Sequence, residues 1–256
     1  MANELQATPK PTFSMMLKSE LETNKEALPA NFNVPRFVQN SLALLNGNDT
    51  LIKFSKQYGT DQIKTGLLRA AYLGLDALHN ECYLVPYGST INFVTSYTGA
   101  IKMAKKYATE PVRQIYAETV KEGDSLKTWI EDGKKRFTFQ KDPFSSGKII
   151  GCIAVCVYED EHIDYELLSI SDLENIRKQS KARNSLAWST FTEEMYKKAA
   201  IRRLCKRLTL DMDAETSAAF DSGLELERDQ KELARRDIAE HENSEDFEDF
   251  VESEVL

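Results

Sequence analysis

The sequence predicts an α+β protein: N-terminal helices, then a β-hairpin plus an antiparallel sheet with packed helices, and a flexible acidic C-terminal tail. Apolar residues recur with helical spacing before residue 80 and after residue 170, whereas residues 112–170 contain four β-prone runs. Carboxylates crowd residues 211–256. We therefore expect a flexible arm (1–30), a folded body (31–210) and an acidic tail (211–256) that is helical in part.

The N-terminal third predicts two helices behind a polar arm. Residues 1–12 are polar and contain two prolines, which is typical of a disordered end. The first helix is expected to begin at Val34, with Pro35 in its first turn, and to end at Gly47. The second is expected over residues 61–75, with Gly74 near its end.

A β-hairpin and a further helix follow. The runs CYLVPY and INFVTS predict a hairpin over residues 81–96, with Pro86 at an edge or bulged position. A helix is expected over residues 97–107. It places Tyr97 on one face and Lys102, Lys105 and Lys106 on the opposite face.

The β-rich region contains the candidate strands VRQIYAETV, FTFQ, IIGCIAVCVY and IDYELLSI. The third run is apolar at successive positions, which indicates a central strand covered on both faces. Beyond the strands, Ser171 and Glu174 have capping-box spacing at the start of a helix. A second long helix is expected over residues 188–208, and residues 225–239 have helical character.

Composition narrows the class of protein. The chain has 256 residues with 41% hydrophobic residues, and no apolar run is long enough for a transmembrane helix. The first 30 residues lack a signal-peptide pattern, and four cysteines do not make a disulfide scaffold. We therefore expect a cytoplasmic protein that does not bind membranes.

Charge is unevenly distributed along the chain. Residues 211–256 contain 17 acidic and four basic side chains, whereas residues 1–210 contain 24 acidic and 29 basic ones. The overall net charge of −8 therefore conceals a mildly basic body and a strongly acidic tail. The tail residues 245–250 set phenylalanines among carboxylates, so we interpret the tail as a partner-binding or self-competing segment; a solubilising end is the alternative.

The strongest functional signal is a cluster of six cations within residues 197–207. Helical spacing places Lys198, Arg202 and Lys206 in one row and Arg203 and Arg207 in a neighbouring row. Like charges at this spacing repel, so the helix needs a compensating anion. We interpret the cluster as a polyanion contact, although a solvated helix face or pairing with the acidic tail would also explain it.

Further cations and aromatic residues lie near this cluster. Arg177 and Lys181 extend the basic stretch upstream, and Trp188 lies between the two groups of cations. Cations that follow phosphates and rings that stack on bases suit single-stranded nucleic acid. Trp188 would equally serve as a core anchor, and the lysines of residues 97–107 as a solvated face.

Catalytic and metal-binding patterns are weak. The sequence lacks a phosphate-binding glycine loop, and its three histidines do not form a nucleophile–base arrangement. Cys152 and Cys156 would lie about 13 Å apart on one strand, too far to share a zinc ion. Two acidic-x-Lys patterns, 132–134 and 229–231, are poor nuclease candidates. We expect no catalysis, cofactor or metal.

Six stretches carry a family resemblance: LGLDALHNECYLVPYG (73–88), INFVTSYTGAIKMAKKY (91–107), IYAETVKEGD (115–124), GKIIGCIAVCVY (147–158), LLSISDLENIRKQSKA (167–182) and residues 188–208. In this order they resemble the RecT family of phage single-strand DNA annealing proteins, over roughly residues 35–210. The sequence departs from the family pattern at Thr98, where a basic residue is usual, and at Ala187, Ala199, Arg207 and Thr209. The residue at Thr98 argues against a phosphate contact by that turn, whereas Arg207 adds a cation to the basic helix.

The resemblance implies an annealing-protein-like β-β-β-α core in a DNA-binding and oligomerisation domain. It implies ATP-independent annealing of complementary strands in phage-type homologous recombination, by an oligomeric ring or helical filament in the bacterial cytoplasm. The implied partners are single-stranded DNA, the annealed duplex intermediate, a 5′-to-3′ exonuclease and the host single-strand binding protein. The alternatives are a metal-dependent DNA nuclease and a DNA-independent phage scaffold protein.

The expected DNA contacts combine this resemblance with the charge pattern. The primary phosphate contacts are expected to be Lys198, Arg202, Arg203, Lys206 and Arg207, and the secondary ones Lys102, Lys105 and Lys106. The rings expected to stack on bases or orient them are Tyr97 and Trp188. The upstream cations of the set are Arg177 and Lys181.

Overall fold

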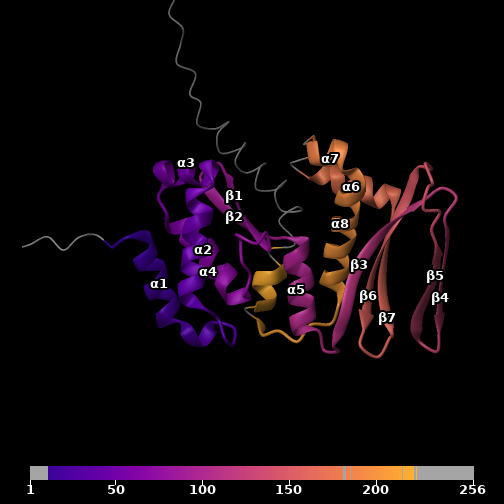
Figure 1. Ribbon diagram of the computed structural model, residues 1–256, viewed down its shortest axis with the longest axis horizontal. Coiled ribbons are helices and arrows are strands. Elements are labelled where there is room, and N and C mark those ends of the chain that lie inside the picture. The colour runs from indigo at the N-terminus through magenta and orange to yellow at the C-terminus, as the bar shows by residue number, and fades with distance from the viewer. Residues whose placement is uncertain (1–10, 181–182, 185, 215, 222, 224–256) are drawn as a thin grey trace, which may run out of the picture.

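The structure is a computed structural model that describes residues 11–180, 183–184, 186–214, 216–221 and 223. Figure 1 shows the N-terminal helices and the first β-hairpin at one end of the molecule, the remaining strands at the other, and two helices, α5 (Tyr97–Tyr107) and α8 (Thr192–Arg207), between them. The predicted α+β class is confirmed. Among the described residues, no helix has the length and apolar character needed to cross a membrane.

The folded part of the chain begins within the predicted N-terminal arm. Residues Phe13–Thr23 form α1, capped by the Thr12 side chain, and Lys25–Ala27 form the short helix η1. Leu17 and Leu21 lie one helical turn apart and are both fully buried. The expected arm over residues 1–30 is therefore wrong for residues 13–27; residues 1–10 lie outside the described part of the chain.

Three more helices complete the N-terminal part. These are α2 (Val34–Asn46), α3 (Asp49–Tyr58) and α4 (Asp61–Leu73). The predicted starts of α2 and α4 are confirmed, and Gly74 ends α4 in the left-handed conformation with φ 71°. Helix α3 was not predicted. It begins directly after Asn48, whose side chain accepts hydrogen bonds from the Thr50 and Leu51 amides.

The predicted hairpin and the helix after it are confirmed. Strands β1 (Cys82–Tyr87) and β2 (Thr90–Thr95) pair antiparallel, and Ser96 caps α5 (Tyr97–Tyr107). Gly99 allows α5 to approach the start of the hairpin, because an added Cβ would lie only 2.0 Å from the Glu81 carbonyl oxygen.

A three-stranded antiparallel sheet, which we call the central sheet, packs against α8. Its order is β3 (Val112–Lys121), β6 (Ile149–Tyr158) and β7 (Ile163–Ser169). One face of β6 joins the main core, whereas Ile153 and Val155 pack against Phe137 and Phe139 of a separate hairpin. That hairpin comprises β4 (Ser125–Glu131) and β5 (Lys134–Gln140). The prediction of a central, doubly covered strand is confirmed; β4 was not predicted.

The C-terminal helices differ in detail from the prediction. Helix α6 (Ile170–Gln179) begins with a capping box between Ser169 and Asp172, instead of Ser171 and Glu174. The single long helix expected over residues 188–208 is two helices, α7 (Leu186–Thr190) and α8 (Thr192–Arg207). Helix α8 packs on all three strands of the central sheet, which gives the expected sheet-and-helix core.

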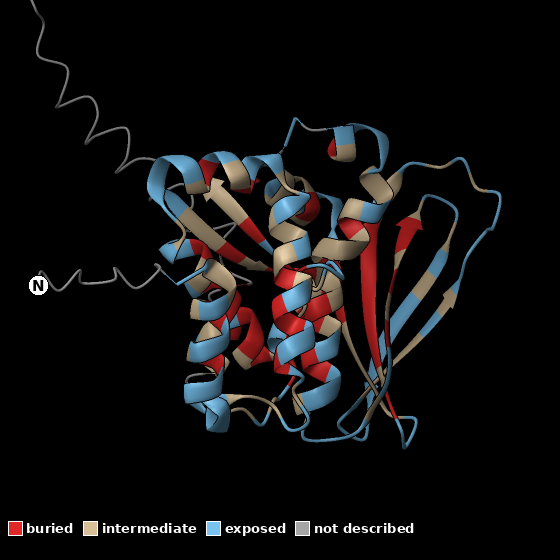
Figure 2. Ribbon diagram, turned by 60° about the vertical axis from the view of Figure 1, so that its left-hand side comes forward, coloured by how far each residue is buried: buried red, intermediate tan, exposed pale blue. Residues whose placement is uncertain are grey.

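The folded body continues beyond residue 210, into the predicted acidic tail (211–256). Leu210 forms a β-bridge with Ala108, and the Asp211 amide donates to the Tyr107 carbonyl oxygen. Phe220 is 1% exposed and belongs to the main core. Buried positions line the inner sides of the helices and strands (Figure 2). The predicted helical segment at residues 225–239 lies outside the described residues.

Candidate nucleic-acid interface

Helix α8 has a buried side and a basic side. Ile201, Leu204 and Cys205 are buried, which fixes the helix against the core. The other side carries the two predicted rows of cations, and we call it the outer face of α8: Lys198, Arg202, Arg203, Lys206 and Arg207. Acidic residues lie in the first turn of α8 and Lys206 and Arg207 in the last, an order that the helix dipole favours.

Two of these cations bind a carboxylate of the same chain. Arg203 Nε lies 3.0 Å from Glu166 Oε1, and an Arg207 guanidinium nitrogen lies 2.6 Å from Glu166 Oε2. Glu166 lies on β7 and is 7% exposed, whereas the side chains of Arg203 and Arg207 are 41% and 58% exposed. One negative charge thus faces two positive charges. The group of Glu166, Arg203 and Arg207 therefore retains a net positive charge that can attract a phosphate.

The remaining row lies beside α5. The ammonium group of Lys198 is 5.4 Å from the centre of the Tyr97 ring, a cation–π contact that joins α8 to the first turn of α5. Lys198 and Arg202 are half-buried and Lys206 is exposed. Arg202 and Lys206 each also interact within the chain. The predicted residues Tyr97, Lys198, Arg202 and Lys206 therefore belong to one surface.

The three lysines of α5 have partners within the chain. Lys102 lies 2.6 Å from a carboxylate oxygen of Glu81, and Lys105 donates to the Arg113 carbonyl oxygen. Lys106 donates to the Tyr107 hydroxyl. All three lysines are exposed, so these contacts are screened and reversible. The structure gives them local roles in addition to any contact with DNA.

Thr98 also has a structural role in this region. Its hydroxyl forms hydrogen bonds with the Ser96 hydroxyl and the Asn80 carbonyl oxygen. The position where the family pattern has a basic residue thus connects α5 to the turn before β1.

Trp188 is part of the core and cannot stack on a base in this conformation. It is 2% exposed and meets Tyr196 edge to face, with ring centres 6.0 Å apart. The Arg177 guanidinium lies 5.9 Å from the Trp188 ring and 3.7 Å from a Glu174 carboxylate oxygen. Of the two roles considered for Trp188, the structure supports the core anchor. Lys181 lies outside the described residues.

Two exposed aromatic residues near this surface were not in the predicted set. Phe191, 59% exposed, lies at the break between α7 and α8. Tyr83 on β1 is 43% exposed; burial, together with nearby Tyr97, raises the pKa of its hydroxyl. Tyr83 lies between buried Cys82 and Leu84, so strand alternation in the sequence could have placed it on the surface.

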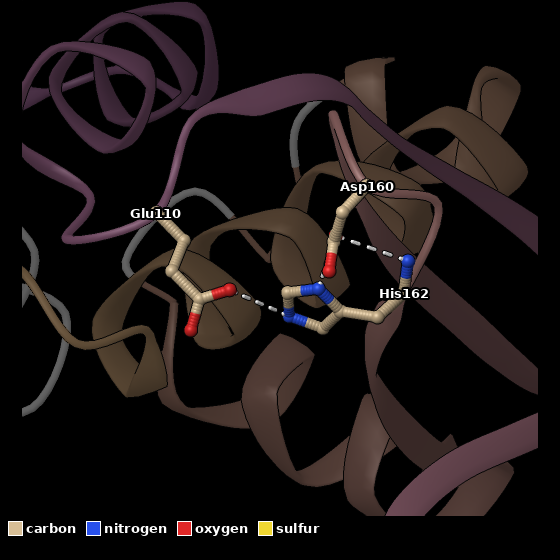
Figure 3. A group of neighbouring side chains, drawn as sticks. All are labelled: Glu110, Asp160 and His162. Atoms are coloured by element: carbon tan, nitrogen blue, oxygen red, sulfur yellow. Dashed lines mark hydrogen bonds and ion pairs between the residues drawn. The ribbon is translucent and has the colours of Figure 1, made fainter.

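A histidine and two carboxylates meet where the α5–β3 connection passes the β6–β7 turn (Figure 3). His162 Nε2 lies 3.2 Å from Glu110, and its Nδ1 lies 2.5 Å from Asp160. The hydrogen bond from His162 holds the pKa of Asp160 below its usual value. Each ring nitrogen faces a different carboxylate, an arrangement complete only when both nitrogens carry a proton. The group therefore connects the α5–β3 connection to the β6–β7 turn.

The four cysteines are buried free thiols. Burial raises the pKa of Cys156 to about 11 and the pKa values of Cys152 and Cys205 to about 12. Burial also raises the pKa of Cys82. These thiols remain protonated at neutral pH and are poor nucleophiles.

Comparison with known proteins identifies the family. A family model described as "RecT family" matches residues 35–238. The chain belongs to the RecT family. It is also similar to Protein RecT of Escherichia coli (strain K12), with 26% identity over 168 residues. The aligned region covers 61% of this chain and 61% of that relative.

Proposed function

We propose that this chain binds single-stranded DNA along the outer face of α8 and anneals complementary strands in phage-type recombination. The observation that carries the proposal is the row Lys198, Arg202 and Lys206 beside the Tyr97 ring, in a chain of the RecT family. Cations can neutralise phosphates while an aromatic ring receives a base.

The dimensions of the row favour weak binding by one protomer. Helical rise places its cations about 6 Å apart, so the row spans about 12 Å from Lys198 to Lys206. A strand with about 3.4 Å between successive phosphates would offer only three or four phosphates over that length. Many protomers on one strand would convert these weak contacts into stable binding. We therefore infer an oligomer, either a ring or a helical filament.

The mechanism requires no ATP. Neutralising the phosphates of one strand lowers its repulsion toward a second strand. Base stacking then stabilises the duplex by about 1.4 kcal/mol per step, so annealing is downhill once complementary segments meet. In this proposal the protein holds one strand accessible and contributes no covalent chemistry.

The proposed activity requires a supply of single strands. We infer that a 5′-to-3′ exonuclease exposes the strands and that the host single-strand binding protein competes for them, in the bacterial cytoplasm. The annealed duplex intermediate is the second nucleic-acid ligand of the proposed cycle.

A fluorescence annealing assay tests the proposal. Two complementary oligonucleotides, each carrying one member of a dye–quencher pair, should anneal much faster with the protein and without ATP. Unlabelled competitor strand should abolish the effect, and electron microscopy should show assemblies that grow when the second strand is added. An unchanged annealing rate would contradict the proposal. Shortened strands in the presence of Mg²⁺ or Mn²⁺ would favour the nuclease alternative.

A further inference from the structure

The described fold ends next to the proposed DNA site. Phe220 is buried in the main core, and an added Cβ at Gly223 would lie 2.4 Å from the Thr95 hydroxyl oxygen. Thr95 is two residues before Tyr97, whose ring contacts Lys198. The backbone at Gly223 is thus packed against the segment that leads into the first turn of α5, beside the outer face of α8.

The remaining sequence complements this face in charge. Residues 240–256 contain eight carboxylates and neither lysine nor arginine. Phe247 and Phe250 lie among these carboxylates, so the segment combines negative charge with rings, as a nucleic acid strand does. We call residues 240–256 the acidic segment. Its charge is opposite to that of the outer face, which carries five cations, two of them in contact with Glu166.

We propose that the acidic segment binds the outer face of α8 in its own chain and competes there with single-stranded DNA. This inference rests on the proposed function, because it assigns both ligands to one surface. The 16 residues between Gly223 and Glu240 would span about 55 Å as an extended chain and about 24 Å as a helix, against the roughly 24 Å length of α8. The acidic segment can therefore reach every cation of the outer face.

Because the acidic segment is tethered to its own chain, even a weak affinity for the outer face is enough for it to compete with DNA. A segment tethered to its target by a short linker that spans the distance has an effective concentration on the order of 1 mM there. If the free segment binds with a Kd of ~0.1 mM, the tethered segment raises the apparent Kd for DNA about tenfold. A long strand that spans several protomers overcomes this competition, whereas a short strand does not. The device would direct the protein toward long single strands.

The first test compares two full-length variants with equal changes in charge. The tail variant carries Glu245→Gln, Asp246→Asn, Glu248→Gln and Asp249→Asn. The control variant neutralises four exposed carboxylates of the folded body: Glu26→Gln, Glu122→Gln, Asp132→Asn and Glu159→Gln. We expect the tail variant to bind a short fluorescein-labelled oligothymidylate about tenfold more tightly than the unmodified chain, and the control less than twofold more tightly. An equal change in oligothymidylate affinity in both variants, or no change in affinity in either, would overturn the proposal.

The second test uses the acidic segment as a free labelled peptide. Added to the full-length tail variant, the peptide should bind with a submillimolar Kd, and oligothymidylate should displace it. Binding should be lost when Lys198→Ala and Arg202→Ala are added. Unaffected binding in that variant would overturn the assignment to the outer face.

A dilution series distinguishes the chain's own segment from that of a neighbouring copy. Competition within one chain is independent of protein concentration, so the ratio of Kd values between the unmodified chain and the tail variant should stay constant. A ratio that rises with protein concentration would overturn binding within the same chain. The peptide test does not depend on annealing, so a failed annealing assay with intact peptide binding would contradict only the proposed function.

Discussion

Replacing Glu166 by glutamine is expected to lower the stability of the fold while raising its affinity for single-stranded DNA. Glu166 is a nearly buried carboxylate that binds Arg203 and Arg207 of the outer face. Glutamine keeps the shape and one acceptor oxygen but removes the negative charge. The positive charge of the two arginines is then no longer offset by a carboxylate and is available to a phosphate.

The stability loss is small because both arginines are well hydrated. One arginine loses its acceptor, which costs about 2 kcal/mol, and the other keeps a hydrogen bond to a neutral oxygen, which is about 1 kcal/mol weaker, giving roughly 3 kcal/mol in all. Arg203 and Arg207 are 41% and 58% exposed, so solvent screening reduces this to about 1 kcal/mol. For a chain of this size, the expected decrease in Tm is about 2–4 °C.

The gain in DNA affinity follows from the restored charge. Each phosphate contact contributes about 0.7 to the slope of log K against log salt concentration for single strands. Removing Glu166 restores about one such contact, so the slope should become steeper by about 0.7 and binding at 0.1 M salt about fivefold tighter.

Fluorescence anisotropy with oligothymidylate over a salt series, combined with thermal unfolding, measures both effects. Glu118→Gln is the matched control, because Glu118 also contacts two cations, Lys141 at 2.6 Å and Lys197 at 3.9 Å, away from the outer face. It should lower Tm without changing the slope. A weaker affinity or an unchanged slope in Glu166→Gln would show that Arg203 and Arg207 do not contact DNA.

Substitutions at three further positions test the fold around the site. The hydrogen bond from Lys121 lowers the pKa of Glu193. The ionised Glu193 therefore stabilises the fold fully above the ordinary carboxyl pKa, and this contribution is lost as pH falls through the lowered pKa. Urea unfolding should therefore show Glu193→Gln less stable than the unmodified chain by about 0.5 kcal/mol at pH 7, and this difference should shrink as the pH falls below the ordinary carboxyl pKa; a difference that is constant with pH would contradict the ion pair. Gly99→Ala should cost roughly 1–3 kcal/mol in calorimetry, because its Cβ meets the Glu81 carbonyl oxygen; unchanged stability would contradict that contact. Trp188→Ala should cost about 3–5 kcal/mol in the same assay and Trp188→Phe less, whereas a loss of DNA affinity without a loss of stability would restore a stacking role.

Elements with strong local signals were predictable from the sequence. Helix α5 has the predicted bounds because Ser96 caps it and its apolar positions share one face. Strand β6 was recognisable from its unbroken apolar run. Helix α1 was missed because only Leu17 and Leu21 are buried in a largely polar segment, and β4 because most of its side chains are exposed. The break at Phe191 has no glycine or proline to mark it.

The candidate site was predictable only as far as one helix extends. Periodicity placed Lys198, Arg202 and Lys206 in one row, since helical geometry alone decides that arrangement. It could not show that Glu166, on β7, would meet Arg203 and Arg207, because that contact depends on how α8 packs across the sheet. The same limit applies to Trp188, whose burial depends on the α7–α8 arrangement.

The salt dependence of DNA binding by the double variant Arg202→Ala, Lys206→Ala tests the central claim most directly. If the outer face of α8 holds phosphates, the slope of log K against log salt concentration should fall in magnitude by about 1.4, for two lost contacts. The matched control is Lys53→Ala, Lys56→Ala, which removes two exposed lysines from α3 and should leave the slope unchanged. A folded Arg202→Ala, Lys206→Ala protein with an unchanged slope would mean that the outer face is a solvated helix surface and that DNA binds elsewhere.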